Sequence, residues 1–249
     1  MSAPRLYVDL ALAAGTRVTL PAESARHAVR VLRCRRGDPL VLFDGRGGEY
    51  PGTVDSVSRQ DCVVVLGEHC DRDVESPLDL QLVQGLSRGD RMDTVVQKAT
   101  ELGVRRITPL AGEHSVVRLA GERAEKRLRH WQRVSLSACE QCGRNRPPRV
   151  DAPLSLGALL ELPVPEGTRR LLLDPSAELP LAAAAGTAAG ALQLLVGPEG
   201  GFSDEERERV LAAGFVSASL GPRVLRTETA AIAAVTLVQA RLGDLAPRG

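Results

Sequence analysis

The stretch LLVGPEGGFSDEE, residues 194–206, decides the fold class more than any other part of the chain. An apolar strand runs into the glycine-rich turn Gly197–Gly201, and a helix follows whose first turn carries Ser203 and Glu206 at the spacing of a capping box. Strand, glycine turn and capped helix are typical of an α/β protein, in which ligands bind beyond the carboxyl ends of the strands. The glycines allow backbone N–H groups to approach a ligand closely, although a purely structural tight turn fits the pattern equally well. The spacing matches neither the dinucleotide-binding motif GxGxxG nor the phosphate-binding P-loop.

The chain after Pro77 alternates strand and helix patterns in the same way. Apolar runs predict buried strands at 78–86, 104–110, 169–174, 192–197 and 215–221. Helices are expected between and after them at 90–103, 122–142, 203–214 and 228–242. The last helix is apolar almost all round, so we expect it to be buried. This alternation predicts an α/β domain, with a parallel sheet covered by helices on both faces.

The first 70 residues show a different pattern, of short strands broken by turns. β-rich runs lie at 17–20, 39–44, 48–57 and 61–67. The segment DGRGG, residues 44–48, predicts a hairpin, and one helix is expected over 23–33. The polar, proline-ended segment 71–77 is typical of a linker. We therefore expect a small, mostly β-barrel domain over 1–72 and the α/β domain over 73–249.

The composition is that of a globular protein with locally concentrated positive charge. Of the 249 residues, 43% are hydrophobic and 25% charged, and the net charge of +1 excludes a uniformly basic nucleic-acid-binding protein. Two basic stripes suggest a polyanion site: five arginines without an acid in 24–37, and nine Lys or Arg against three Glu in 118–149. Arginine makes up 30 of the 32 basic residues, a bias that genome composition explains as well. Because no signal peptide and no apolar run of about 18–20 residues is found, we expect a cytosolic protein.

A second polar stretch, LGPRVLRTETAAIAA at 220–234, stands directly before the closing apolar helix. It places Arg223, Arg226 and Glu228 beside a helix that is expected to be buried. Charges in such a position need partners or a ligand. Thr227 or Thr229 is expected to act as the N-cap of the helix.

A third stretch, SACEQCGRNRPPRV at 137–150, contains a CxxC motif and a basic turn. Cys139 and Cys142 have no second cysteine pair and no suitably spaced histidines for zinc, so we expect no metal site and interpret both as ordinary buried cysteines. Gly143 is expected to end the preceding helix. The residues 144–146 are then expected in an exposed turn suited to phosphate or base contacts, with a solvated loop as the alternative.

These stretches together resemble one family, the ribosomal RNA small subunit methyltransferase E family within the knotted SPOUT methyltransferase superfamily. The resemblance covers essentially the whole chain, and the ordered set of motifs is specific although each motif is weak alone. The motifs are Pro4–Tyr7, His27 with Val31–Arg33, Gly37-Asp38, Asp44-Gly45, Gln97-Lys98 with Glu101–Gly103, Ile107–Leu110, Trp131-Gln132, Ala138–Asn145, Gly197–Gly201 and Leu220–Thr229. The chain departs from the family at Gly112–Ser115, where Ser-Glu-Arg-Ser is common, and at Arg88, where lysine is common. The segment 151–192 matches poorly.

The resemblance implies a specific activity and architecture. The activity is S-adenosylmethionine-dependent methylation of N3 of one uridine, uracil-1498, in 16S rRNA. The architecture is an N-terminal PUA-like β-barrel that binds RNA, followed by an α/β domain with a trefoil knot. General rules of chain connectivity alone would argue against a knot. The resemblance also implies a homodimer.

The resemblance also implies which residues form the sites. The cofactor-binding residues are expected to be Leu173, Gly197, Pro198, Glu199, Gly200, Gly201, Leu220, Gly221, Arg223, Val224, Leu225 and Thr227. The RNA-binding residues are expected to be Arg5, Arg26, Arg30, Arg33, Arg144, Asn145 and Arg146. Aromatic residues are only 2% of the chain, so arginine rather than base stacking is expected to dominate the RNA contacts.

The chemistry of uridine N3 narrows the catalytic candidates. The N3–H group is a weak nucleophile until it loses its proton, so a general base or a group that stabilises the uridine anion is expected. Glu228 is the candidate base and Arg226 the candidate stabilising group. A structural salt bridge between these two residues fits the sequence equally well.

Other functions fit parts of the sequence. A non-catalytic RNA-binding protein with a vestigial pocket would explain the basic stripes but not the glycine-rich loop. A phosphate-handling α/β enzyme would use Gly197–Gly201, but that loop contains no lysine. A methyltransferase of the same superfamily that acts on another RNA is the third alternative.

Overall fold

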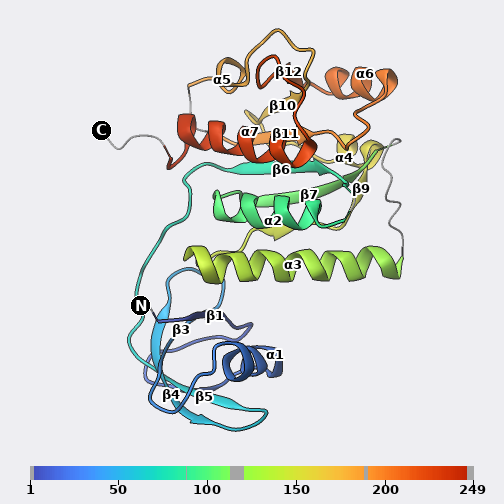
Figure 1. Ribbon diagram of the computed structural model, residues 1–249. Helices are drawn as coiled ribbons and strands as arrows, with labels where there is room; N and C mark the ends of the chain where they lie inside the picture. The colour runs from blue at the N-terminus through green and yellow to red at the C-terminus, as the bar shows by residue number, and fades with distance from the viewer. Residues whose placement is uncertain (1–2, 88, 113–120, 188–189, 246–249) are drawn as a thin grey trace. The chain divides into compact units, whose positions relative to one another are not determined.

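The computed structural model describes residues 3–87, 89–112, 121–187 and 190–245 (Figure 1). The chain divides into two compact units. Unit 1 consists of Met1–Glu75 and Leu136–Pro147, and unit 2 consists of Ser76–Ser135 and Pro148–Gly249. Arg88 and residues 113–115, where the sequence departs from the family pattern, lie outside the described residues. Among the helices of the described residues, none combines the length and the hydrophobicity that crossing a membrane requires.

Unit 1 is built on a five-stranded sheet. Its strands are β1 (Arg5–Tyr7), β2 (Arg17–Thr19), β3 (Pro39–Phe43), β4 (Tyr50–Val57) and β5 (Cys62–Leu66), in the order β1-β3-β4-β5-β2. The β1–β3 pair is parallel and the other pairs are antiparallel, and the predicted hairpin joins β3 to β4. The predicted helix over 23–33 is shorter, an α-helix α1 (Ala22–Arg26) followed by a π-helical segment (His27–Val31). Alternate residues of β5 point into the core and are buried, which explains its hydrophobic pattern.

Residues 136–147 pack with the N-terminal sheet although they are distant from it in sequence. They include the last turns of the long helix α3 (Glu122–Cys142). The backbone N–H of Tyr7 donates to Glu140 Oε1 at 3.0 Å, and Arg5 Nη2 donates to Asn145 Oδ1 at 2.6 Å. The sequence pattern placed this whole segment in the second domain, because such long-range polar contacts leave no local signal.

Unit 2 contains a parallel sheet, as the sequence predicts. Its strands are β6 (Leu80–Gly85), β7 (Arg106–Ala111), β8 (Arg149–Val150), β9 (Leu154–Ser155), β10 (Arg169–Leu173), β11 (Leu192–Val196) and β12 (Val216–Ala218). The order is β12-β10-β11-β6-β7-β8, with β9 paired to β7, and all of these pairs are parallel. The remaining helices are α2 (Arg91–Glu101), α4 (Leu156–Glu161), α5 (Leu181–Ala184), α6 (Asp204–Ala212) and α7 (Thr227–Leu242).

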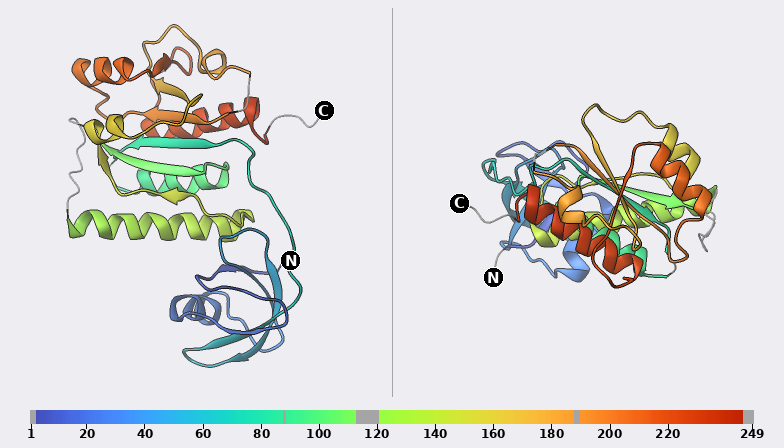
Figure 2. Two further views of the ribbon diagram at one scale, coloured as in Figure 1. Left: turned by 180° about the vertical axis from the view of Figure 1, so that it is seen from behind. Right: turned by 90° about the horizontal axis from the view of Figure 1, so that it is seen from above.

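Helices cover both faces of this sheet. One hydrophobic core joins α2, α7, α5 and Trp131 of α3 to one face, and a second core joins α4 and α6 to the other face. In Figure 1 α2 and α7 lie in front of the strands, and in the reverse view of Figure 2 the strands lie in front of them. α7 is buried along one face and not on every side, although it is apolar almost all round. Ala231, Val235 and Val238 are buried, whereas Ile232 and Leu237 remain partly exposed.

The ends of β6 and β11 approach each other closely at Gly85. Gly85 ends β6, and a Cβ atom at this position would overlap the backbone of Gly197 and Pro198. Gln84, the residue before it, is fully buried and donates from Nε2 to Thr227 Oγ1 at 2.8 Å. The Thr227 hydroxyl in turn donates to the Gly197 carbonyl at 2.7 Å. Strand β6, the glycine turn after β11 and the start of α7 are therefore fixed to one another.

We predict that Gly85→Ala lowers the stability of the protein. The new methyl group meets backbone atoms that must shift, and overpacking of this kind costs about 1–3 kcal/mol. Thermal unfolding measures the effect. Gly157→Ala in α4 is the matched control, because its Cβ would meet only the end of the Arg209 side chain at 3.4 Å. An unchanged melting temperature for Gly85→Ala would show that the two strand ends are not closely packed.

Candidate active site

A cavity of about 740 Å³ opens at the carboxyl ends of β10, β11 and β12. Three loops form its walls: 173–176 after β10, 196–202 after β11 and 220–227 after β12. Arg91, at the start of α2, adds a side chain from a fourth segment. Parallel strands place these loops at one edge of the sheet, which is where α/β proteins bind ligands.

The structure brings together all twelve residues that the sequence resemblance assigned to a cofactor. They share this lining: Leu173, Gly197, Pro198, Glu199, Gly200, Gly201, Leu220, Gly221, Arg223, Val224, Leu225 and Thr227. Val224 is 82% exposed, so its contact with the cavity is at the rim. Arg226 also lines the cavity and is exposed, but Glu228 is not among the lining residues.

The glycine turn is followed by the capping box that the sequence predicts. Ser203 accepts from the backbone N–H of Glu206 at 3.2 Å, and Glu206 accepts from the backbone N–H of Ser203 at 3.1 Å. The box sets where α6 begins and so ends the cavity loop at a fixed point. The N-cap prediction for α7 is wrong, because Arg226 occupies that position and no side chain caps the helix. Thr227 is instead in the hydrogen-bonded chain between Gln84 and Gly197.

Sequence reasoning missed an ionised carboxylate in the wall. Asp174 accepts hydrogen bonds from the amide and hydroxyl of Ser176 at 2.9 and 2.6 Å, and from Arg207 Nε at 2.7 Å. Burial alone would raise the pKa of Asp174, but the bonds from Ser176 and the nearby charge of Arg207 outweigh it and hold the pKa below its ordinary value. The available signal was an Asp-Pro-Ser sequence at a strand end, although Arg207 lies 33 residues further along the chain.

Arg91 was also missed, and it joins two carboxylates. Its Nη1 lies 2.6 Å from Glu199 Oε1, and its Nε lies 3.8 Å from Glu228 Oε1. The Glu228 side chain is 17% exposed, and its Oε2 is buried without a hydrogen-bond partner among the described residues. Within the same residues no ion pair joins Glu228 to Arg226, so the predicted alternative pair is replaced by Glu228 with Arg91.

Comparison with known proteins identifies the family. Residues 74–239 match the family model of an RNA methyltransferase domain, and residues 20–67 match that of an RNA methyltransferase PUA domain. The ribosomal RNA small subunit methyltransferase E of Buchnera aphidicola is 32% identical over 97% of this chain and 98% of its own, and that of Mycobacterium bovis is 34% identical over 96% and 92%.

The chain belongs to the ribosomal RNA small subunit methyltransferase E family.

A solved structure is similar over the same length. The crystal structure of the ribosomal RNA small subunit methyltransferase E of Neisseria gonorrhoeae, bound to S-adenosyl methionine, has a TM-score of 0.90 and 37% identity. The similarity covers 98% of this chain and 99% of that one.

In this family member the basic turn at 144–146 is not the exposed element that the sequence predicts. Arg144 is only 4% exposed and Asn145 only 1%. Arg144 Nε donates to Glu75 Oε2 at 2.8 Å, and Asn145 Nδ2 donates to the carbonyl of Arg72 at 2.8 Å. The expectation of an exposed turn is therefore wrong for these two residues. Their acidic partner lies about 70 residues earlier in the chain and could not be paired with them from the sequence.

The other predicted RNA-binding residues fall into two groups. Arg5 forms an ion pair with Glu49 and is mostly buried, so its charge holds unit 1 together. Arg26, Arg30 and Arg33 are exposed on or beside the helical segment 22–31, and Arg146 is exposed as well.

The two cysteines of the CxxC motif differ in their surroundings. Burial raises the pKa of the Cys139 thiol to about 12, so it is not a thiolate at neutral pH. Cys142 is only half-buried, unlike the prediction, and both thiols are free. Within the described residues no group of three or more His, Cys, Asp or Glu side chains could hold a metal ion.

Proposed function

We propose that the protein methylates N3 of a single uridine, uracil-1498, in 16S rRNA and uses S-adenosylmethionine as the methyl donor. The observation that carries the proposal is the cavity at the strand ends, where the twelve residues that resemble the family's cofactor loops converge. Membership of the family supports the RNA substrate, and the cofactor in the Neisseria gonorrhoeae relative supports the donor.

The residues present fit the proposed cofactor. The cavity of about 740 Å³ lies within the range of small-molecule sites. Gly201 has φ +71°, and nothing lies within 4 Å of the position that a Cβ would take, so its backbone borders open space in a conformation that side chains disfavour. We propose that Gly197–Gly201 and Leu220–Leu225 hold the cofactor, with Leu173 and Thr227 bordering it. When bound, S-adenosylmethionine supplies a sulfonium methyl group that the N3 lone pair takes as the carbon–sulfur bond breaks.

Glu228 is the proposed acceptor of the N3 proton. Its Oε2 is buried and has no hydrogen-bond partner among the described residues, so one acceptor position of the carboxylate is unfilled. Arg91 lies beside Oε1 and holds the carboxylate from the opposite side. The exposed Arg226, at the edge of the cavity, is the proposed group that stabilises negative charge on the uracil ring.

We also propose the finer architecture of the family for this chain. The five-stranded sheet of unit 1 would close as a PUA-like barrel, and the match of residues 20–67 supports this. The segment after β12 would form the trefoil knot. In support, β12 pairs with β10 rather than β11, and α7 then returns to contact β6 and α2.

The proposed RNA contacts of unit 1 are Arg26, Arg30, Arg33 and Arg146, all of which are exposed. We propose a homodimer, because the apolar side chains of Ile232 and Leu237 on α7 are partly exposed. Light scattering at micromolar protein concentration tests the oligomeric state. We propose that the protein acts in the cytoplasm, because the proposed substrate is ribosomal RNA.

Gly200→Val is predicted to abolish cofactor binding without unfolding the protein. Gly200 lines the cavity and is exposed, and it is not among the glycines with positive φ, so a valine there adds bulk without backbone strain. Calorimetry with S-adenosylmethionine should show no binding, while the melting temperature remains that of the unaltered protein. Unchanged affinity would place the cofactor elsewhere.

Glu228→Gln is predicted to lower turnover on 16S rRNA by about 10²–10⁴-fold, because the amide keeps the size of the side chain but accepts no proton. Affinity for S-adenosylmethionine and melting temperature should stay unchanged. Arg91→Gln is the structural control, since it removes the ion pair with Glu228, together with the one to Glu199, and leaves the Glu228 carboxylate in place. If both variants lower the melting temperature alike and Glu228→Gln retains normal turnover, Glu228 is a structural partner of Arg91.

A further inference from the structure

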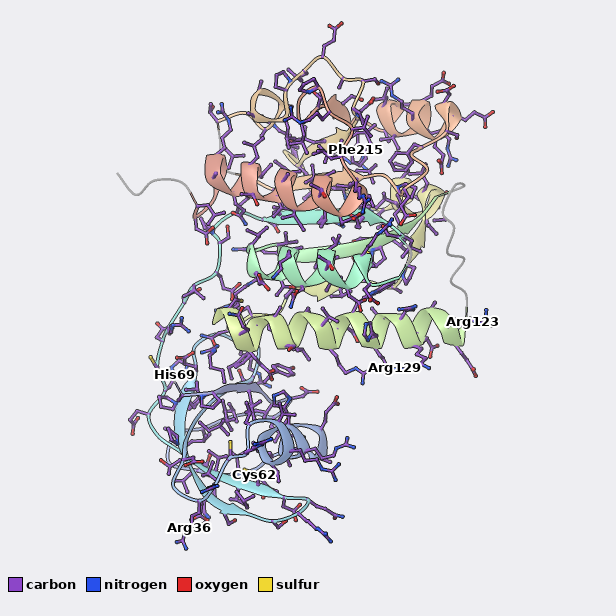
Figure 3. The ribbon with its side chains drawn as sticks, viewed as in Figure 1. Arg36, Cys62, His69, Arg123, Arg129 and Phe215 are labelled. Carbon is purple, nitrogen blue, oxygen red and sulfur yellow. The ribbon has the colours of Figure 1, made fainter. Side chains whose placement is uncertain are left out.

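The part of α3 that belongs to unit 2 carries a dense row of exposed positive charge. Two of its residues, Arg123 and Arg129, are labelled in Figure 3. Its exposed cations are Arg123, Lys126, Arg127, Arg129 and Arg133. Two acids, Glu122 and Glu125, lie in the same stretch and both are in the first turn. We call these five cations the α3 basic face.

These charges contribute little to the fold. Arg129 pairs with Glu125 at 3.4 Å, but the two side chains are 64% and 69% exposed, and pairs of this kind are worth little. Arg123, Lys126 and Arg127 have no ion pair among the described residues. α3 is held to unit 2 through Trp131, which is buried in the core of that unit. Maintaining the helix therefore does not depend on the charges of Arg123, Lys126, Arg127 and Arg129.

The basic face lies beside the start of α2, the segment that contributes Arg91 to the cavity. Arg123, Arg127 and His130 follow one another at i, i+4 and i+7 and so share one flank of α3. On this flank His130 Nε2 lies 2.6 Å from Asp93 Oδ2, and Trp131 Nε1 donates to Asp93 Oδ1 at 3.1 Å. Asp93 belongs to the first turn of α2, two residues after the cavity residue Arg91. This flank therefore contacts the first turn of α2, which contributes Arg91 to the cavity.

We infer that the α3 basic face binds the phosphate backbone of the RNA on one side of the nucleotide that enters the cavity. The inference rests on the proposed function. Residues 123–133 span about 15 Å of helix, which is long enough to contact several consecutive phosphates. Arginine and lysine side chains bind phosphate by charge, and Arg129 and its neighbours are exposed enough to reach it. The α3 basic face takes the place of the buried residues Arg144 and Asn145 as the second RNA-contacting stripe.

The double variant Arg123→Glu/Arg127→Glu tests the inference. Binding of a 16S rRNA transcript should weaken by about tenfold or more near physiological salt, and the plot of log Kd against log salt should flatten by about 1.4–1.8 for the two lost phosphate contacts. The Kd for S-adenosylmethionine should stay within twofold. The matched control is Arg209→Glu, which reverses an exposed arginine on α6, on the opposite face of the sheet, and should leave the salt slope unchanged.

A salt slope equal to that of the unaltered protein in the double variant would overturn the inference, as would an equal loss in Arg209→Glu. If the charge reversal lowers the melting temperature, the double variant Arg123→Gln/Arg127→Gln is used instead. The slope of log Kd against log salt for this variant should flatten by the same amount, because it also loses two phosphate contacts. Methyl transfer by the unaltered protein in the same assay tests the proposed function separately. Normal transfer with no effect of the variants would reject the α3 site alone.

Discussion

The active-site cavity depends on the close approach of Gly85 to the Gly197–Pro198 peptide. A side chain at Gly85 would separate β6 from the turn after β11. The same point is held by a chain of hydrogen bonds from Gln84 through the Thr227 hydroxyl to the Gly197 carbonyl. One contact therefore sets the position of the glycine turn and the start of α7 together. The capping box at Ser203 then fixes the other end of the turn, so both ends of the loop are anchored.

The charged groups around the cavity of unit 2 are of two kinds, carboxylates paired with arginines and arginines that remain exposed. Carboxylates at the cavity are held by arginines: Asp174 by Arg207, and Glu199 by Arg91. Other arginines, such as Arg226 at the rim, remain exposed. A site with neutralised acids and exposed cations at its mouth suits a neutral adenosine moiety inside and a polyanion outside. The low net charge of the chain is compatible with this, because the positive charge is concentrated locally.

Local sequence signals predicted the parallel sheet and the capping box, because apolar runs and caps act over a few residues. The convergence of the cavity loops was predicted only through the family resemblance. Features that depend on distant partners were missed. The sequence alone suggests that Arg144 is an exposed cation, but in the fold it forms an ion pair with Glu75. It likewise suggests that Thr227 is an N-cap, but the Thr227 hydroxyl is hydrogen-bonded to Gln84 and Gly197. Arg91 follows an ordinary glycine turn, and nothing near it in sequence indicates Glu199 or Glu228.

Methylation of uridine N3 in 16S rRNA is the central activity that we propose for the protein. The most direct measurement is nucleoside mass spectrometry of 16S rRNA from cells that lack the protein and from the same cells with it restored. Loss of N3-methyluridine in the first sample and its return in the second is the predicted result. Undiminished N3-methyluridine in 16S rRNA of cells without the protein would contradict the account.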